Sequence, residues 1–467
     1  MPQRAATIIF IVGILGLFWL NRNRHVKTSW ALWLVVLWVA MGGTRAPSEW
    51  LAAFGIGHTG PAVANSYVDG SPVDRNIFLA LLIPGVYVLF QRRRRVLTLL
   101  RANGPILLYF LYCGISVSWS DYPDVAIRRW FKALGDVVMA LLVVTDLNPS
   151  VAMRRLIARL GFIFLPLSIL FIKWYGNLGR DYRPDYGNWI ITYTGVTTSK
   201  NMLGMIVLIF GLGAVWRLLQ AWRRDGDSRR PGVIIAQGVL LVIAIWLFHL
   251  VHSMTSLACF MMAVCLLVVT SLPIFARKPW VVHVLVGSMV TLSFLVLFLN
   301  IGTGLLTTMG RDATLTGRTD IWNLVLGMTA SPLVGTGFES FWLGKRLDAM
   351  WAIYWWHPNE AHNGYLEVYL TLGWIGIFLL AMLLITGYWH GVNEFRRDPE
   401  TGKLKLAYFV IAVAYNFTES AIRTMNPVWT FFLIATLAVP PPKRIKRKPP
   451  PPAPLLEAQN ASCLEEV

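Results

Sequence analysis

The sequence predicts an all-α membrane protein that crosses the bilayer many times. Of its 467 residues, 56% are hydrophobic and only 14% are charged, whereas soluble domains carry about 25% charged residues. The apolar residues come in runs of about 20, the length that a helix needs to cross a hydrocarbon core about 30 Å thick. This composition excludes a soluble enzyme and a disordered chain. The four cysteines form no CxxC or Cys/His metal spacing, so we expect neither a disulfide framework nor a zinc site.

Thirteen apolar runs follow one another along the chain. They are 6–20, 29–43, 76–90, 104–120, 133–147, 156–173, 201–220, 232–251, 254–275, 280–300, 365–389, 405–420 and 427–439. The first two and the last two are short, so we expect about 11 to 13 transmembrane helices. Only Arg4 precedes the first run, and no small-residue cleavage site follows it. This run is therefore predicted to be a retained span rather than a cleaved signal peptide.

Basic residues gather in alternate loops. The clusters are 21–27, 91–96, 154–159, 223–230, 277–278, 395–405 and 443–448, and with Arg101 and Arg217 they hold 27 of the 42 Lys and Arg residues. With thirteen spans, all seven clusters fall on one face, which the positive-inside rule makes cytoplasmic. The N-terminus is then outside and the C-terminus inside.

The loops divide the chain into four parts. An N-terminal transmembrane bundle, 1–300, contains an outer loop at 174–200. The largest outer loop, 301–364, is followed by the C-terminal transmembrane helices, 365–439. The tail, 440–467, is rich in proline and basic residues, a composition that does not form a core. We expect a disordered cytoplasmic tail near anionic headgroups.

A short amphipathic helix is predicted within 316–330, TGRTDIWNLVLGMTA. Its apolar residues recur with helical spacing, and it is too short to span, so we expect it to lie at the membrane interface. Arg318 falls in its first turn, where a cation opposes the helix dipole. Arg318 therefore either binds an anion together with the helix N-terminal amides or contacts lipid headgroups.

The rest of this outer loop offers three further candidate site residues. The segment SPLVGTGFESFW, 331–342, is predicted to be a turn that folds the loop back and carries Glu339. Asn363 can cap the span that begins at Tyr365. His362 then stands at the mouth of that span, and its near-neutral pKa suits proton removal from a hydroxyl. Two other interpretations remain open. His357, Glu360 and His362 could form a metal site, although their HxxxxH spacing does not match HExxH. Alternatively, His362 makes a hydrogen bond to a loop carbonyl.

The earlier outer loop, WYGNLGRDYRPDYGNWIITYTGVTTSK, supplies more cations among aromatic rings. Arg180, Arg183 and Lys200 are the candidates. Aromatic residues with arginine suit a sugar or pyrophosphate site, and they equally suit a membrane-interface belt. Lys200 begins a span, where it can also snorkel toward the headgroups.

The order of these motifs resembles the O-antigen ligase and polysaccharide polymerase family of bacterial inner-membrane proteins. GRTDIW is followed by PLVGTGFESFW, and AHNGYLE then leads into a span that contains LGWIG. YTGVTTSKNMLG (193–204) and RRWFKALGDVVM (128–139) are most similar to the exopolysaccharide-production branch. The resemblance covers roughly 29–439 and is strongest over 316–376.

The resemblance implies a metal-independent glycosyltransferase that uses a lipid-linked donor. The donor is a glycan on undecaprenyl pyrophosphate, and transfer to an acceptor hydroxyl at the periplasmic face releases the lipid pyrophosphate. It implies no cofactor, no nucleotide sugar and no nucleic acid. The partners are the donor, a glycan or lipid A-core acceptor, membrane lipids and other polysaccharide-export proteins. The protein is then a multi-pass protein of the inner (plasma) membrane, with an active site that faces the periplasm.

The resemblance also assigns residues. Arg318 and His362 are the expected catalytic residues, with arginines holding the pyrophosphate and His362 accepting the acceptor's proton. The family's arginine in the earlier outer loop corresponds to Arg180, with Arg183 as a substitute. Lys200, Glu339 and Asn363 complete the expected substrate-binding set. Exopolysaccharide polymerisation is the preferred function, with O-antigen ligation to lipid A-core as its alternative.

A transporter or flippase is the alternative from another class. Transporters usually show internal repeats, broken helices and paired ionisable residues near the membrane centre. The sequence has no convincing repeat and little charge in its spans, and its polar residues gather in the outer loops. This distribution favours the enzyme.

Overall fold

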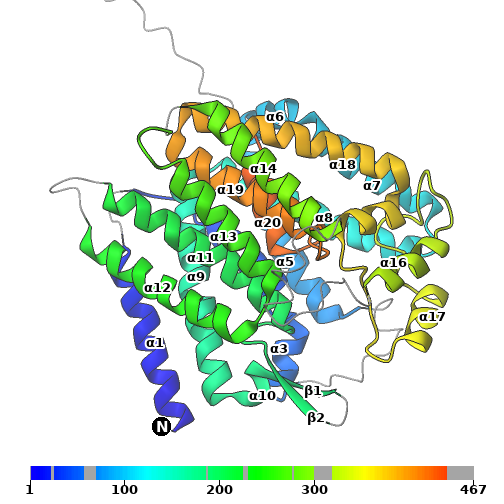
Figure 1. The fold of residues 1–467 in the computed structure, drawn as a ribbon, viewed down its shortest axis with the longest axis horizontal. Helices are drawn as coiled ribbons and strands as arrows, with labels where there is room; N and C mark the ends of the chain where they lie inside the picture. The colour runs from blue at the N-terminus through cyan, green and yellow to red at the C-terminus, as the bar shows by residue number, and fades with distance from the viewer. Residues whose placement is uncertain are drawn as a thin grey trace, which may run out of the picture.

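The structure is a computed structural model that describes residues 2–22, 26–56, 70–185, 188–223, 230–275, 278–298 and 318–438. The described chain is helical except for one antiparallel hairpin (Figure 1). The helices are α1 (Gln3–Leu20), α2 (Leu32–Gly43), α3 (Pro47–Ala53), α5 (Pro72–Gln91), α6 (Arg93–Ala102), α7 (Gly104–Ile115), the 3₁₀ helix η1 (Ser116–Trp119), α8 (Pro123–Val144), α9 (Pro149–Trp174), α10 (Gly176–Gly179), α11 (Lys200–Trp222), α12 (Pro231–Val251), α13 (Met254–Val269), α14 (Pro279–Phe298), α16 (Arg318–Gly327), α17 (Lys345–Ile353), α18 (Gly364–Arg397), α19 (Pro399–Tyr415) and α20 (Pro427–Thr436). The strands are β1 (Arg180–Asp185) and β2 (Asn188–Tyr193).

Each of the thirteen predicted apolar runs lies mainly on a helix. Six described helices, α1, α5, α9, α11, α12 and α18, are long and apolar enough to cross a bilayer. A seventh span is possible if α6 and the helical stretch Gly104–Trp119, which meet at 89°, are counted as one broken span. Four shorter apolar helices of 10–17 residues accompany them. The predicted all-α, multi-pass membrane fold is confirmed. The predicted tail, 440–467, and residues 301–317 of the large loop lie outside the described residues.

Helices α9 and α11 form the centre of the bundle, and α1 lies at its edge. In α11, 72% of the apolar 18-residue segment that could cross the membrane is buried inside the protein. In α1, only 11% of the corresponding segment is buried. α1 packs mainly against α9 and α12, at the left of the view in Figure 1. An apolar helix with so little burial requires lipid around most of its circumference, because its exposed side chains would otherwise face water.

A buried carboxylate joins three elements of the bundle. Asp136 of α8 is fully buried. One of its oxygens accepts a hydrogen bond from Trp38 Nε1 of α2 at 2.8 Å, and the other accepts from the backbone N–H of Met425 at 2.8 Å. A buried carboxylate is costly unless it is hydrogen-bonded. Asp136 therefore fixes the start of the segment that leads into α20.

The predicted span 365–389 is interrupted within α18. Gly373 has φ 64° and ψ −162°, so the helix is broken there. The turn 331–342 fills the break, since the N–H groups of Trp374 and Ile375 donate to Pro332 O and Leu333 O. A Cβ on Gly373 would lie 2.3 Å from the backbone of Leu333. The LGWIG motif thus binds the turn 331–342 of the large loop through backbone hydrogen bonds.

The outer loop 174–200 has more structure than the sequence indicates. It forms α10 and the β1–β2 hairpin, in which Arg180 pairs with Tyr193 and Asp185 with Asn188. The hairpin lies at the lower edge of the molecule in Figure 1. Strand β2 has the sequence NWIITY, and its β-branched and aromatic residues favour β structure.

Helix α11 runs from one end of the bundle to the other, and its two ends have different surroundings. Its first turn, at Asn201, contacts the α19–α20 loop. Its last turns, at Arg217 and Gln220, line a cavity with the C-terminal end of α1 and the N-terminal ends of α9 and α12. The 23 residues of α11 separate these ends by about 35 Å, one bilayer thickness. Three of the predicted basic clusters therefore meet at one end.

Candidate active site

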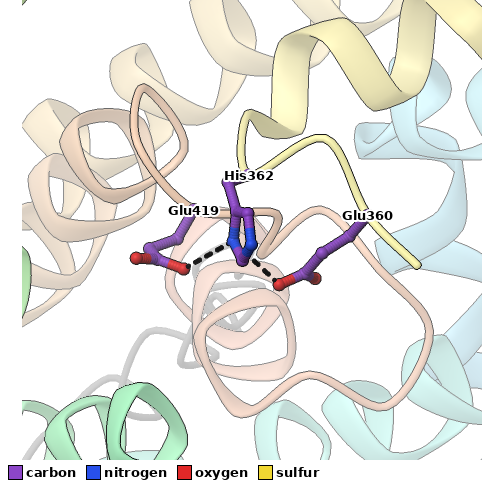
Figure 2. Close-up of side chains that lie close together, drawn as sticks. All are labelled: Glu360, His362 and Glu419. Carbon is purple, nitrogen blue, oxygen red and sulfur yellow. Dashed lines mark ion pairs between the residues drawn. The ribbon is translucent and has the colours of Figure 1, made fainter. Parts of the chain in front are cut away.

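His362 lies between two carboxylates at the α11 N-terminal end of the bundle. Its Nδ1 is 3.0 Å from Glu360 Oε1 and 3.4 Å from Glu419 Oε2, as Figure 2 shows. Nδ1 is buried without a well-aligned hydrogen bond to either oxygen. Glu360 precedes α18, whereas Glu419 comes from the loop between α19 and α20 (416–426). The cluster therefore exists only when two distant segments come together.

Arg318 extends this cluster from the first residue of α16. Its Nη2 is 3.2 Å from Glu419 Oε1, and its Nη1 donates to the carbonyl of Thr418. The same Glu419 oxygen accepts from Asn201 Nδ2 at 3.2 Å. Arg423 supplies a second guanidinium, 3.4 Å from Glu360 Oε2. Each carboxylate thus has both His362 and an arginine beside it.

Helix α16 is positioned by its apolar face, as the sequence predicts. Ile321 and Val325 are buried in a small core with residues of the turn 331–342, α17 and α18. Trp322 Nε1 donates to the carbonyl of Ala361, next to His362, at 2.8 Å. Burial of one helix face therefore directs Arg318 toward the α19–α20 loop and connects α16 to the histidine segment.

A left-handed residue turns the chain at His362. Its φ is 51°, a conformation uncommon for a residue with a side chain. The turn lets Asn363 cap α18, since Asn363 Oδ1 accepts from the N–H groups of Tyr365 and Leu366 at 3.0 and 3.1 Å. The predicted cap is confirmed. The N–H of Ala361 donates to Glu367, so backbone on both sides of His362 is fixed.

The 416–426 loop is held in one shape by its own buried polar groups. Asn416 Oδ1 accepts from the N–H groups of Ala421 and Ile422 at 2.8 and 2.9 Å. The N–H of Gly364 donates to the carbonyls of Asn416 and Glu419. A Cβ at Gly364 would lie 1.9 Å from Asn416 Oδ1, so only glycine permits this approach. The loop and the start of α18 are thus locked together.

The charges of the cluster shift two pKa values in opposite directions. Burial alone would lower the pKa of His362, but the carboxylates of Glu360 and Glu419 raise it to about 9. Burial alone would raise the pKa of Glu360, yet His362, Arg423 and Arg318 together lower it. At neutral pH the cluster therefore holds an imidazolium, two guanidinium groups and two carboxylates. One positive charge remains unbalanced.

A cavity of about 70 Å³ adjoins the cluster and contains Glu360 and Arg423 in its wall. Glu339 also lines it, and its Oε1 accepts from Thr424 N and Oγ1 at 3.0 and 2.6 Å. Arg129 of α8 donates to the carbonyl of Glu339. This cavity lies between the turn 331–342, the start of α18 and the 416–426 loop.

Backbone strain gathers around this cavity and cluster. Among the described residues, five non-glycine residues have positive φ, and four of them are here: Glu339, His357, His362 and Met425. Such conformations cost about 1–3 kcal/mol each and persist where surrounding contacts hold them. Their concentration supports the assignment of this region as the functional site.

The comparison with known proteins agrees with this location. Residues 241–381 match the family described as O-antigen ligase. The matched segment makes up 141 of the 467 residues. The chain is also 25% identical over 343 residues, covering 71% of this chain and 75% of the relative, to "Exopolysaccharide production protein ExoQ" of Rhizobium meliloti (strain 1021). The matched segment contains Arg318, Glu360 and His362, whereas Glu419 and Arg423 follow it.

The predicted site residues fall into two groups. Arg318 and His362 meet at the cluster, and Glu339 lines the adjoining cavity. Asn363 directs its side-chain oxygen to the cap of α18. The remaining cations belong to the hairpin region: Arg180 Nε donates to Ile172 O at 2.8 Å, and Lys200 is exposed at the start of α11. The side chain of Arg183 lies outside the described residues.

Glu419 and Arg423 are site residues that the sequence analysis missed. The apolar run 405–420 placed Glu419 inside a transmembrane helix, which is wrong: α19 ends at Tyr415. The signal was present in NFTESAIRTMNP, 416–427, where polar residues follow one another before a proline. Such a stretch favours a loop over a span.

The cluster also has the composition of a possible metal site. One ligand atom each from Glu360, His362 and Glu419 lies within 4.8 Å of the others. However, each carboxylate already has a guanidinium beside it, and a protonated histidine is not a metal ligand. This donor set fits an ion-paired histidine better than a divalent cation.

Proposed function

We propose that this protein is a membrane glycosyltransferase that moves a glycan from undecaprenyl pyrophosphate to an acceptor hydroxyl at the periplasmic face. Exopolysaccharide polymerisation is the proposed process. The observation that carries the proposal is the meeting of Arg318, His362, Glu360 and Glu419 at one end of a transmembrane bundle. The match of residues 241–381 to the family described as O-antigen ligase and the similarity to an exopolysaccharide production protein support it.

The charge of the cluster suits an anionic donor. Three cationic groups and two carboxylates leave one net positive charge beside a cavity. Arg318 can turn from Glu419 to a pyrophosphate, because a guanidinium binds both kinds of anion in a bidentate fashion. Arginine at this position would also stabilise the negative charge that develops on the leaving group. We therefore assign donor binding to Arg318.

The proposed reaction is a displacement at the anomeric carbon of the donor. The acceptor oxygen forms the new bond to that carbon, and the bond to the phosphate oxygen breaks. Lipid pyrophosphate leaves with the electron pair, while the proton of the acceptor hydroxyl passes to a base. With a pKa of about 9, only about 1% of His362 is neutral at pH 7. His362 can therefore accept the proton only from its neutral fraction, unless Glu360 or Glu419 accepts it.

The acceptor separates two versions of this proposal. A polymerase would extend a second lipid-linked repeat, whereas a ligase would give the glycan to lipid A-core. The similarity to ExoQ, named for exopolysaccharide production, favours the polymerase. In a strain that lacks this protein, loss of long secreted polymer with intact capped lipopolysaccharide supports polymerisation. The reverse phenotype supports ligation.

The direct test is glycosyl transfer by purified protein in detergent, with a lipid-linked oligosaccharide as donor. We expect transfer by the wild type and a loss of about 10²–10⁴ in rate for His362→Ala, the usual effect of removing a general base. Donor binding should persist in His362→Ala and weaken in Arg318→Ala. Asp121→Asn is a matched control, because Asp121 also pairs with an arginine, Arg346, in an outer segment away from the cluster.

Three results would contradict the proposal or its assigned roles. No transfer by the wild type, together with facilitated movement of the lipid-linked glycan across vesicles, would favour the transporter or flippase. Loss of donor binding in His362→Ala with intact binding in Arg318→Ala would reverse the assigned roles. Equal losses in Asp121→Asn and His362→Ala would show that neither loss reports on the cluster.

A further inference from the structure

A second cavity lies at the opposite end of α11 from the His362 cluster. We call it the arginine cavity, and its volume is about 500 Å³, within the range of ligand sites in proteins. It is lined by the C-terminal end of α1, the N-terminal ends of α9 and α12 and the C-terminal end of α11. Six of its fourteen lining residues are arginines: Arg22, Arg154, Arg155, Arg159, Arg217 and Arg230.

No acidic residue lines the arginine cavity in the described part of the chain. The remaining polar lining residues are Asn21 and Gln220, which carry no charge. Six guanidinium groups around one hollow repel one another, and an anion bound there would lower that cost. This imbalance distinguishes the cavity from the His362 cluster, where two carboxylates share the space with the arginines.

Several arginines are held in position rather than free to turn outward. Arg155 donates to Thr28 Oγ1 at 2.7 Å, and Arg217 donates to Gln220 Oε1 at 3.1 Å. The guanidinium carbon of Arg159 lies 4.0 Å from the ring centroid of Trp33. These contacts preorganise the charge around the hollow, which lowers the cost of binding a ligand.

Arg159 contributes a nitrogen to the wall that has no acceptor within the residues that the structure describes. Its Nη1 is buried and has no hydrogen-bond partner among the described residues. A buried cationic N–H without an acceptor is costly. An anion oxygen in the cavity would remove that cost.

The rest of the wall favours a lipid as the source of that anion. Phe18, Val26, Val151, Ala158 and Val233 give the cavity apolar sides. α1, which forms one edge, is largely exposed along its apolar length, so the cavity lies at the lipid-facing perimeter. We propose that the arginine cavity binds the phosphate of an anionic lipid headgroup, on the face that the basic loops predict to be cytoplasmic. Basic pockets between transmembrane helices are suited to such headgroups.

The test is binding of short-chain phosphatidylglycerol to the purified full-length protein, measured by native mass spectrometry. Phosphatidylcholine of the same chain length serves as the neutral probe. The variant is Arg22→Gln with Arg159→Gln, and the matched control is Arg396→Gln with Arg397→Gln, two exposed arginines at the end of α18. An arginine near an anionic headgroup contributes about 1 kcal/mol. The cavity variant should therefore bind phosphatidylglycerol about 30-fold more weakly, and the control should bind it like the wild type.

A second variant guards against loss of folding, since Arg159 packs on Trp33. Arg22→Gln with Arg230→Gln changes two exposed side chains and should also weaken phosphatidylglycerol binding about 30-fold. Equal weakening in the Arg396/Arg397 control, or equal binding of the two lipids by the wild type, would overturn the proposal. Inorganic pyrophosphate is titrated alone and against phosphatidylglycerol. Tight binding of pyrophosphate with displacement of the lipid would overturn the lipid assignment and identify a soluble phosphate ligand.

Discussion

Replacing Glu419 with glutamine should lower the pKa of His362. The glutamine side chain retains an oxygen that can accept from Arg318 and Asn201, so the change removes mainly a negative charge. That charge lies 3.4 Å from His362 Nδ1. At this separation a unit charge contributes about 1 kcal/mol in bulk water and about 5 kcal/mol at an effective dielectric constant of 20. Loss of the Glu419 carboxylate should therefore lower the pKa by about one to four units, from about 9 toward the ordinary value near 6.5.

The direction of the His362 pKa shift follows from the protonation state that the carboxylate stabilises. A carboxylate stabilises imidazolium, so its removal makes His362 lose its proton at lower pH. If neutral His362 is the base, kcat/KM of the wild type should rise about tenfold per pH unit between pH 7 and 8 and level off above about 9. In Glu419→Gln the same rise should occur at lower pH. The diagnostic quantity is the pH midpoint, which does not depend on how much the variant's maximum rate falls.

The assay is kcat/KM for glycosyl transfer across about pH 4.5–10, a range that brackets the expected midpoints. It compares the wild type, Glu419→Gln and the control Asp121→Asn, whose carboxylate pairs with Arg346. The control should keep the wild-type midpoint. An unchanged midpoint in Glu419→Gln, or a rate that does not rise with pH in the wild type, would refute the assignment of His362 as the base. A flat profile would instead point to one of the carboxylates.

Four other predictions concern the donor site, the metal, the topology and the cap. Arg318→Lys should lose about 10²–10³ in rate, because an ammonium cannot reproduce a bidentate guanidinium contact; wild-type kinetics in this variant would exclude the role. EDTA should leave activity unchanged, and a loss that one divalent ion restores would establish a metal site. Reporter fusions at Met350 and Pro449 should report periplasm and cytoplasm respectively; a cytoplasmic signal at Met350 would invalidate the topology. Asn363→Ala should reduce stability by about 1 kcal/mol in denaturation, whereas Asn363→Asp should retain most of it.

The sequence alone was sufficient for the membrane architecture. Apolar runs that recur every few tens of residues predict helices, because backbone groups in lipid must be satisfied within each segment. The periodic face of α16 likewise placed Arg318 at a helix start, and Asn363 was identified as the cap of α18. These features depend on interactions between residues close in the chain, so local patterns are enough to predict them.

Two features of the backbone, the break at Gly373 and the β1–β2 hairpin, could not be predicted from these local patterns. The break at Gly373 requires the turn 331–342 to supply hydrogen bonds from outside the helix, so a continuous apolar run gave no sign of it. The β1–β2 hairpin arose in a segment whose composition suits a loop, a strand or an interface belt equally well. In both cases tertiary contacts chose among conformations that the sequence left open.

The composition of the site was decided by the tertiary structure. Glu419 and Arg423 come from a loop 57 or more residues after His362, and no pattern within either segment indicates that they meet. The partnership also changes the chemistry, because the carboxylates beside His362 raise its pKa from the neutral range to about 9. A histidine's residue type is fixed by the sequence, but its charge depends on which groups the fold brings within a few ångströms, since electrostatic interactions act through space rather than along the chain.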